Sequence, residues 1–192
     1  MRTALRALFV LALFAAAPLS QAEIITYEAS LAPELPGATG TGFVTVTYDS
    51  AGQTLSIAAN WSGLSGTTTV AHIHCCTAAP GTGTADVAVT PGTLPGFPMG
   101  TQTGSYSTIL DLTDTATYTG AFLTVLGGGT AIGAELALIA GLDNGVAYFN
   151  IHTTTFPGGE IRGFPARVPE PGLLALLGVG LAGLAAARSR KH

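Results

Sequence analysis

Three histidines of this chain lie in two short segments whose spacing could build a metal site. The first segment covers residues 70–76 (Val-Ala-His-Ile-His-Cys-Cys), and the second begins at Asn150. Side chains alternate between the two faces of a strand, so His72 and His74 share one face, and Asn150 and His152 share another. Imidazoles are suitable ligands for zinc or copper, so pairing the two strands would bring three candidate ligands together.

The same residues admit a second interpretation, in which the imidazoles only form hydrogen bonds within a threonine-rich sheet and hold its loops. Glu160 follows a tight turn and could join the histidines as a further ligand. We expect it instead to form a same-face pair with Arg162 that fixes a hairpin, and such a pair contributes under about 1 kcal/mol if exposed. The residues alone leave both interpretations open.

The two cysteines of the chain, Cys75 and Cys76, are neighbours. Adjacent side chains of a regular strand point to opposite faces, so a bond between them needs a strained ring. We therefore expect one buried and one exposed thiol. A vicinal disulfide, an intermolecular bridge and metal ligation are the alternatives.

The N-terminal residues 1–22 are typical of a secretory signal peptide. Two arginines precede an apolar run at 7–17, and small residues follow it, so cleavage by signal peptidase is expected between Ala22 and Glu23. An N-terminal membrane anchor is the alternative.

The C-terminal segment 168–192 combines three features in order. Pro169, Glu170 and Pro171 come first, an apolar run at 172–187 follows, and a basic cluster ends the chain. As a helix the apolar run rises about 24 Å, somewhat short of the roughly 30 Å hydrocarbon core of a bilayer. The basic cluster would stay cytoplasmic and hold the preceding domain outside.

This order of features resembles the PEP-CTERM sorting signal of Gram-negative bacteria. The resemblance implies that an exosortase-type enzyme recognises the tripeptide and removes the transmembrane helix. It also implies export, a transient stage in the inner membrane, and then a position at the cell surface or in the extracellular space. A plain C-terminal anchor is the alternative.

The region between the two ends, residues 23–167, has the size of one domain. It carries ten acidic residues against two arginines, a net charge of −8, and it contains no lysine. Nucleic-acid binding is excluded, because a basic surface for phosphates is missing. The many threonines and few charges suit an exported protein with a hydroxyl-rich surface.

Period-two patterning between glycine-rich breaks predicts a mainly β domain, an antiparallel β-sandwich or barrel with one or two short helices. The full fold class adds an N-terminal signal helix and a C-terminal transmembrane helix. A hairpin is expected over residues 43–61. Strands are expected at residues 24–31, 43–48, 55–61, 70–75, 86–90, 105–112, 146–153 and 160–164.

The clearest predicted helix covers residues 131–142, after a shorter helical stretch around 120–126. Ile132, Leu136 and Ile139 recur there at helical spacing. The helix has a single charged residue, so it must lie partly buried on the sheet.

The histidine segments also carry a family resemblance. Gly-Leu-Ser-Gly at 63–66 and Ala-His-Ile-His at 71–74 are followed by Gly-x-Ala-Tyr-x-Asn-Ile-His-Thr at 145–153 and Phe-Pro-Gly-Gly-Glu-Ile-Arg-Gly at 156–163. Together they resemble the CHRD domain over roughly residues 25–164. Where that family often has glycine after His-x-His, this chain has two cysteines. The resemblance implies an extracellular β-rich module with no established catalytic activity.

Two hypotheses about function follow. The first is a non-enzymatic surface or extracellular-matrix protein without a cofactor, with extracellular polysaccharide or matrix proteins as partners. The second is a secreted module that binds zinc or copper and is distantly similar to the copper-zinc superoxide dismutases. Three histidines do not supply four copper ligands and a separate zinc set, and no Gly-x-Ser-x-Gly motif indicates a hydrolase. We favour the first hypothesis from the sequence.

Overall fold

The computed structural model describes residues 23–169 together with Val179 and Leu181. The expected signal peptide lies outside the described residues, as do Glu170, Pro171 and nearly all of the expected helix at 172–187. Within the part of the chain that is described, no helix is both long and apolar enough to cross a membrane.

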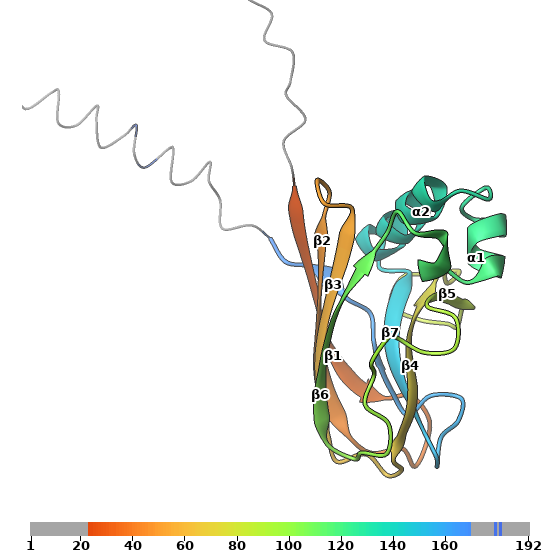
Figure 1. Ribbon diagram of the computed structural model, residues 1–192. Coiled ribbons are helices and arrows are strands. Elements are labelled where there is room, and N and C mark those ends of the chain that lie inside the picture. Colours follow the sequence, from red (N-terminus) through yellow and green to blue (C-terminus); the bar gives the residue numbers. More distant parts are fainter. Residues whose placement is uncertain (1–22, 170–178, 180, 182–192) are drawn as a thin grey trace, which may run out of the picture.

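The described chain forms one antiparallel sheet that curls into a half-barrel (Figure 1). Its strands are Ile24–Pro33 (β1), Thr41–Asp49 (β2), Thr54–Ser62 (β3), Thr68–Cys75 (β4), Val87–Val89 (β5), Gly104–Asp111 (β6), Ala147–Thr153 (β7), Ile161–Gly163 (β8) and Ala166–Arg167 (β9). Neighbouring strands follow the order β5-β4-β7-β8-β1-β2-β3-β6, and β9 pairs with β1 beside this path. The predicted mainly β, antiparallel class is confirmed, in the form of a half-barrel.

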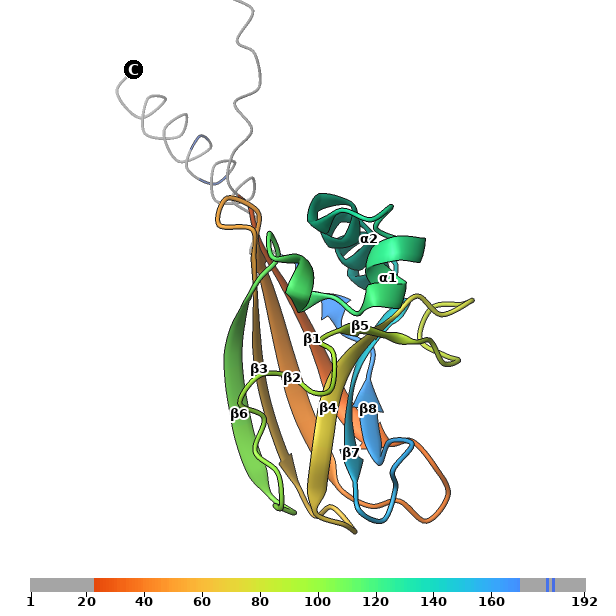
Figure 2. The same cartoon turned by 45° about the vertical axis from the view of Figure 1, so that its right-hand side comes forward.

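The curl places two layers of the sheet face to face, with β4, β7 and β8 on one side and β1, β2, β3 and β6 on the other (Figure 2). The predicted hairpin is confirmed, because β2 and β3 pair along their length with Val44 opposite Ala59. The core between the layers consists of inward-facing apolar side chains, among them Val44, Val46, Leu55, Ile57, Ile73, Phe149 and Ile151.

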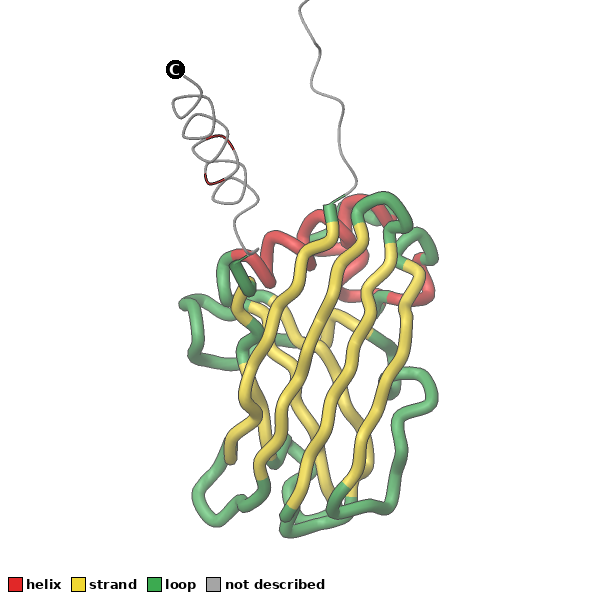
Figure 3. Tube along the Cα trace, turned by 90° about the vertical axis from the view of Figure 1, so that its left-hand side faces the viewer, coloured by secondary structure: helices red, strands yellow, loops and turns green. Residues whose placement is uncertain are grey.

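Short helices cover one end of the half-barrel (Figure 3). They are the 3₁₀ turn Thr115–Thr117 (η1) and the helices Gly120–Val125 (α1) and Ala131–Asp143 (α2). Thr119 and Thr130 cap the two α-helices, because their hydroxyls accept hydrogen bonds from the first-turn amides of Phe122 and Gly133. Both predicted helical stretches are therefore confirmed.

The three apolar residues that indicated helix α2 do not all face the core, and only Ile139 packs against it. Ile132 and Leu136 are 62% and 66% exposed. On the buried face, the carboxylate of Glu135 accepts hydrogen bonds from Tyr48 Oη (2.7 Å) and Gln53 Nε2 (2.8 Å). The residues that α2 buries are Ala134, Glu135, Leu138, Gly141 and Leu142.

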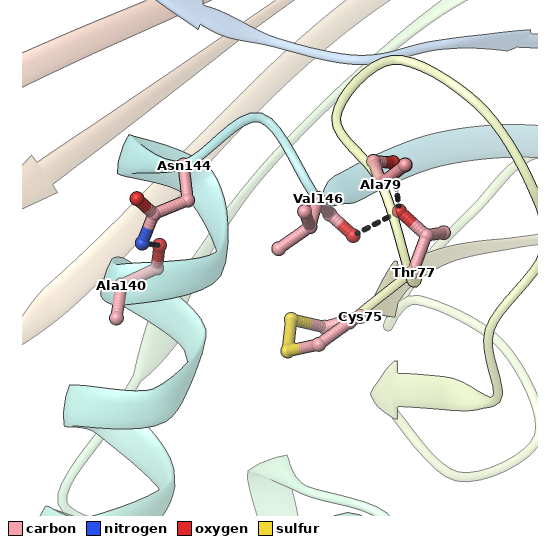
Figure 4. The surroundings of a disulfide bond; sticks show 7 residues. Cys75, Thr77, Ala79, Ala140, Asn144 and Val146 are labelled. Atoms are coloured by element: carbon pink, nitrogen blue, oxygen red, sulfur yellow. Dashed lines mark hydrogen bonds between the residues drawn. A yellow bond between two sulfur atoms is a disulfide. The ribbon is translucent and has the colours of Figure 1, made fainter.

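The expectation of two free thiols is wrong, because Cys75 and Cys76 form a vicinal disulfide (Figure 4). Strand β4 ends at Cys75, so the alternation of a regular strand does not extend to Cys76 and does not separate the two side chains. Both sulfurs face Gly141 of α2, where an added Cβ would overlap Cys75 Sγ and lie 3.3 Å from Cys76 Sγ. The disulfide therefore joins the end of β4 to α2 by close packing.

Gly141→Ala is expected to lower the free energy of unfolding by about 1–3 kcal/mol, because the new methyl group overpacks this contact. Urea unfolding of the variant measures the loss. Gly120→Ala is the matched control, since nothing lies within 4 Å of its added Cβ, and we expect no loss there. Equal stability of the two variants would contradict the close packing of the disulfide on α2.

Candidate metal centre

The antiparallel pairing of β4 with β7 brings the three predicted histidines together. His72 lies opposite Asn150, and His74 lies opposite Tyr148. His152 follows on the same face of β7, and its Nε2 lies 3.4 Å from His72 Nδ1. One ligand nitrogen from each of the three rings lies within 4.8 Å of the others. The predicted convergence of His72, His74 and His152 is therefore present in the structure.

The three rings lie on the face of the sheet that points away from the core, yet they are only 8–9% exposed. The loops that follow β4, β5 and β7 cover them. Each loop contributes a backbone carbonyl, and the three bonds are His74 Nδ1 to Ala85 O (2.8 Å), His72 Nε2 to Gly92 O (2.9 Å) and His152 Nδ1 to Pro157 O (2.7 Å). The rings are thus fixed in orientation from outside.

These carbonyl contacts assign the proton of each ring. A carbonyl oxygen only accepts hydrogen bonds, so the nitrogen that faces it carries the proton. In a neutral ring the second nitrogen then holds a lone pair. The three lone pairs belong to His72 Nδ1, His74 Nε2 and His152 Nε2.

In these tautomers the lone pairs of the three rings face one another, and the amide of Asn150 is the hydrogen-bonding side chain beside them. His152 Nε2 lies 3.4 Å from His72 Nδ1 and 3.2 Å from Asn150 Oδ1, which is also an acceptor. His74 Nε2 is buried without a hydrogen-bond partner. A proton on His152 would serve His72 and Asn150 and would still leave His74 without a partner. A metal ion at the centre would satisfy all three rings.

Burial also favours the form of the rings that binds metal. It lowers the pKa of His72 and His74 below the usual range, against the opposing effect of their hydrogen bonds to Gly92 and Ala85. Metal ligands must be deprotonated, so neutral rings need not lose a proton before an ion enters. A histidine whose other nitrogen donates to a backbone carbonyl is the usual arrangement at metal sites.

Aromatic and charged side chains surround the histidines. The ring of Tyr148 stacks on His74 with 4.6 Å between the centroids, and the Arg162 guanidinium lies 5.2 Å from the Tyr148 centroid. Arg162 Nη1 donates to Gly83 O (2.8 Å) and lies 3.3 Å from Glu34 Oε1. The Arg162 side chain therefore joins the β4–β5 loop to the segment after β1.

Sequence reasoning missed Glu34. Its side chain is 9% exposed, one carboxylate oxygen pairs with Arg162, and the amide of Asn150 is a further hydrogen-bond partner of the carboxylate. Burial raises the pKa of Glu34, while Arg162 and His152 act to lower it. The sequence offered one indication of a special role for Glu34, because it is the only charged residue between Glu28 and Asp49.

Glu160 lies apart from the imidazoles and does not pair with Arg162, so the expected Glu160–Arg162 pair is wrong. It precedes β8 and is fully buried. Its carboxylate accepts hydrogen bonds from Ser65 N (2.5 Å), Ser65 Oγ (2.7 Å), Gly66 N (3.3 Å) and Thr153 Oγ1 (2.6 Å). Glu160 thus joins the β3–β4 turn to the end of β7.

The profile of the CHRD domain matches residues 17–164, which include both histidine segments. This chain belongs to the CHRD domain family. A second profile, the PEP-CTERM protein-sorting motif, matches residues 167–191. Comparison with curated proteins found no match, and comparison with solved structures found none either.

The two profile matches indicate an exosortase-sorted extracellular CHRD protein with a destination in the cell envelope or at the surface. The sorting match begins at Arg167, the last residue of β9, so the CHRD sheet runs directly into the sorting segment. The signal peptide at 1–22, the transmembrane helix at 172–187 and the transient stage in the inner membrane stay predictions.

Glu160→Gln is expected to lower the free energy of unfolding of the CHRD domain by about 2 kcal/mol at pH 7. The carboxylate accepts charge-assisted hydrogen bonds. The NH2 group of glutamine would instead face the hydrogen-bond donors of Ser65, Gly66 or Thr153 and leave them without an acceptor. Burial alone would raise the pKa of Glu160, but the hydrogen bonds from Thr153, Ser65 and Gly66 outweigh it and hold the pKa below its usual value. Urea unfolding at pH 7 measures the loss.

The same variant has an expected pH dependence. A depressed pKa in the folded state gives stability that is present above the ordinary glutamate pKa of about 4.3 and is lost as the pH falls through the folded value. The gap between the native chain and Glu160→Gln should therefore narrow in acid. Glu28→Gln, at an exposed position of β1, is the control and should show no gap. A gap that stays constant in acid would argue against an ionised Glu160.

Proposed function

We propose that this CHRD protein is a non-enzymatic extracellular module that holds one zinc or copper ion between His72, His74 and His152. The convergence of three imidazole lone pairs is the observation that carries the proposal. Each ring is already oriented by a backbone carbonyl, so binding requires little ordering of the ligands.

The donor set suits these ions. Zinc binds imidazole nitrogen at about 2.0–2.1 Å, so two ligands of a tetrahedral ion lie about 3.4 Å apart. His72 Nδ1 and His152 Nε2 have this separation, at 3.4 Å. The three ligand nitrogens span up to 4.8 Å, so ring movements of roughly 1 Å would complete the site. Copper accepts the same imidazole ligands.

Binding rather than catalysis is the proposed role, because loops cover the three rings and leave each only 8–9% exposed. The geometry therefore favours the metal-binding hypothesis over histidines that serve structure alone. A metal ion at this site is compatible with a polysaccharide or matrix partner that binds a different face of the sheet.

A hollow of about 440 Å³ lies on β2, β3 and β6. Five hydroxyl residues and three apolar residues line it, namely Thr45, Thr47, Ser56, Ser107 and Thr108 together with Ile57, Ala58 and Ile109. Uncharged hydroxyl groups suit a neutral extracellular polysaccharide, which presents donors and acceptors of the same kind. The proposed function therefore includes retention at the cell surface or in the matrix by binding to a neutral polysaccharide.

Metal titration tests the central part of this function. The purified chain, freed of metal and offered zinc or copper, should bind one equivalent of one of these ions. A ligand that binds only the folded state at 100 times its Kd stabilises by about 2.7 kcal/mol. We expect a rise in Tm of roughly 5–10 °C for a domain of this size. Calorimetry and elemental analysis give the stoichiometry.

Replacing His72 and His74 by Gln should abolish both the binding and the rise in Tm. His192→Gln is the matched control, because it removes the one histidine that lies outside the CHRD domain, and binding should be unchanged. Absence of a bound equivalent in the native chain, or binding that survives the double replacement, would refute the proposed site.

A further inference from the structure

The helical end of the half-barrel exposes apolar side chains. Val125, Leu126, Ile132 and Leu136, which we call the apolar cap, are 79%, 46%, 62% and 66% exposed. Ile132 and Leu136 stand one turn apart on α2, on the side opposite its buried residues. The two helices contribute little charge to this surface, because the single charged residue between Asp114 and Asp143 is Glu135, whose carboxylate is bonded to Tyr48 and Gln53. Asp86 lines the hollow that Val125 and Leu126 border, so one carboxylate lies at the edge of the cap.

The described domain ends beside this cap. Arg167 of β9 pairs with Tyr27 of β1, and β9 lies close to α2. Tyr27 Oη in turn donates to Asp143 Oδ1 at the end of α2 (2.8 Å). Val168 N continues the pairing by donating to Thr26 O (2.8 Å). The chain therefore leaves the sheet at the end that carries the helices.

The length of chain beyond this point limits how far the cap can lie from a membrane. Residues 168–171 separate Arg167 from the apolar run at 172–187. Four residues reach at most about 14 Å when fully extended. If the apolar run spans the membrane, this tether holds the end of β9 within that distance of the lipid surface, and the C-terminal end of α2 lies beside the start of β1, with which β9 pairs.

We propose that the apolar cap rests on the lipid surface for as long as the sorting segment anchors the chain. Val125, Leu126, Ile132 and Leu136 insert at the boundary of headgroups and acyl chains, as the apolar face of an interfacial helix does. The domain carries a net charge of −8 and no lysine, so the cap binds zwitterionic lipid and is repelled by an anionic surface. This inference rests on the membrane span of residues 172–187 and is independent of the metal site.

Fluorescence of the full chain in phosphatidylcholine vesicles tests the inference. Ala140→Cys, exposed on α2 one turn beyond Leu136, carries an environment-sensitive dye, and the native cysteines do not compete because they are bonded to each other. We expect a blue shift and quenching by acyl-chain quenchers. Met99→Cys is the matched control, because it is 68% exposed and lies near the start of β4, at the opposite end of the sheet. Its dye should behave as it does in water.

A second pair of variants separates the cap from the anchor. Ile132→Ser with Leu136→Ser should remove the shift at Ala140→Cys, whereas Ile109→Ser, an exposed apolar residue of β6, should leave it unchanged. A water-like dye at Ala140→Cys in vesicles would overturn the inference. A shift that arises without lipid and grows with protein concentration would also overturn it, because a second copy of the chain would then cover the cap.

Discussion

The register between β4 and β7 is the constraint on which the candidate site depends. Ile73, Phe149 and Ile151 point into the core and are at most 1% exposed. Side chains alternate along a strand, so a slip of one residue would turn these apolar groups outward and the imidazoles inward. The packing of the core therefore fixes where His72 and His74 lie, although neither of them contributes to that core.

The hydrogen bonds of the three imidazole rings differ from those expected of histidines with a purely structural role. A histidine in a structural role would be expected to satisfy both ring nitrogens once it is buried. Here each ring satisfies one nitrogen through a carbonyl, and the other nitrogens gather at one point. A buried acceptor without a donor costs about 1–3 kcal/mol, so the arrangement lowers the stability of the domain, and a cation bound at the centre would remove that cost. A fold that retains such a cost at one place is typical of a binding site.

Local periodicity predicted most of this fold, and contacts between distant segments account for what it missed. Alternation identified the strands and placed His72, His74 and His152 on shared faces, because it is a property of a single strand. Alternation could not predict that Glu34 pairs with Arg162. The two residues become neighbours because β1 pairs with β8, with Pro33 opposite Ile161, and these strands are far apart in the sequence. The burial of Glu135 on α2 could not be predicted for a similar reason, because its hydrogen-bond donors Tyr48 and Gln53 belong to the distant β2–β3 hairpin.

Two buried carboxylates hold the half-barrel at its opposite ends. At the helical end, Glu135 bonds α2 to the β2–β3 hairpin, while the disulfide of Cys75 packs the same helix against β4. Helix α2 thus connects both layers of the curled sheet. At the other end, Glu160 bonds the turn after β3 to the end of β7. Side chains therefore join the two layers at both ends of a sheet whose edges, β5 and β6, do not pair with each other. The imidazoles lie on the outer face of β4 and β7, beneath the loops that follow β4, β5 and β7.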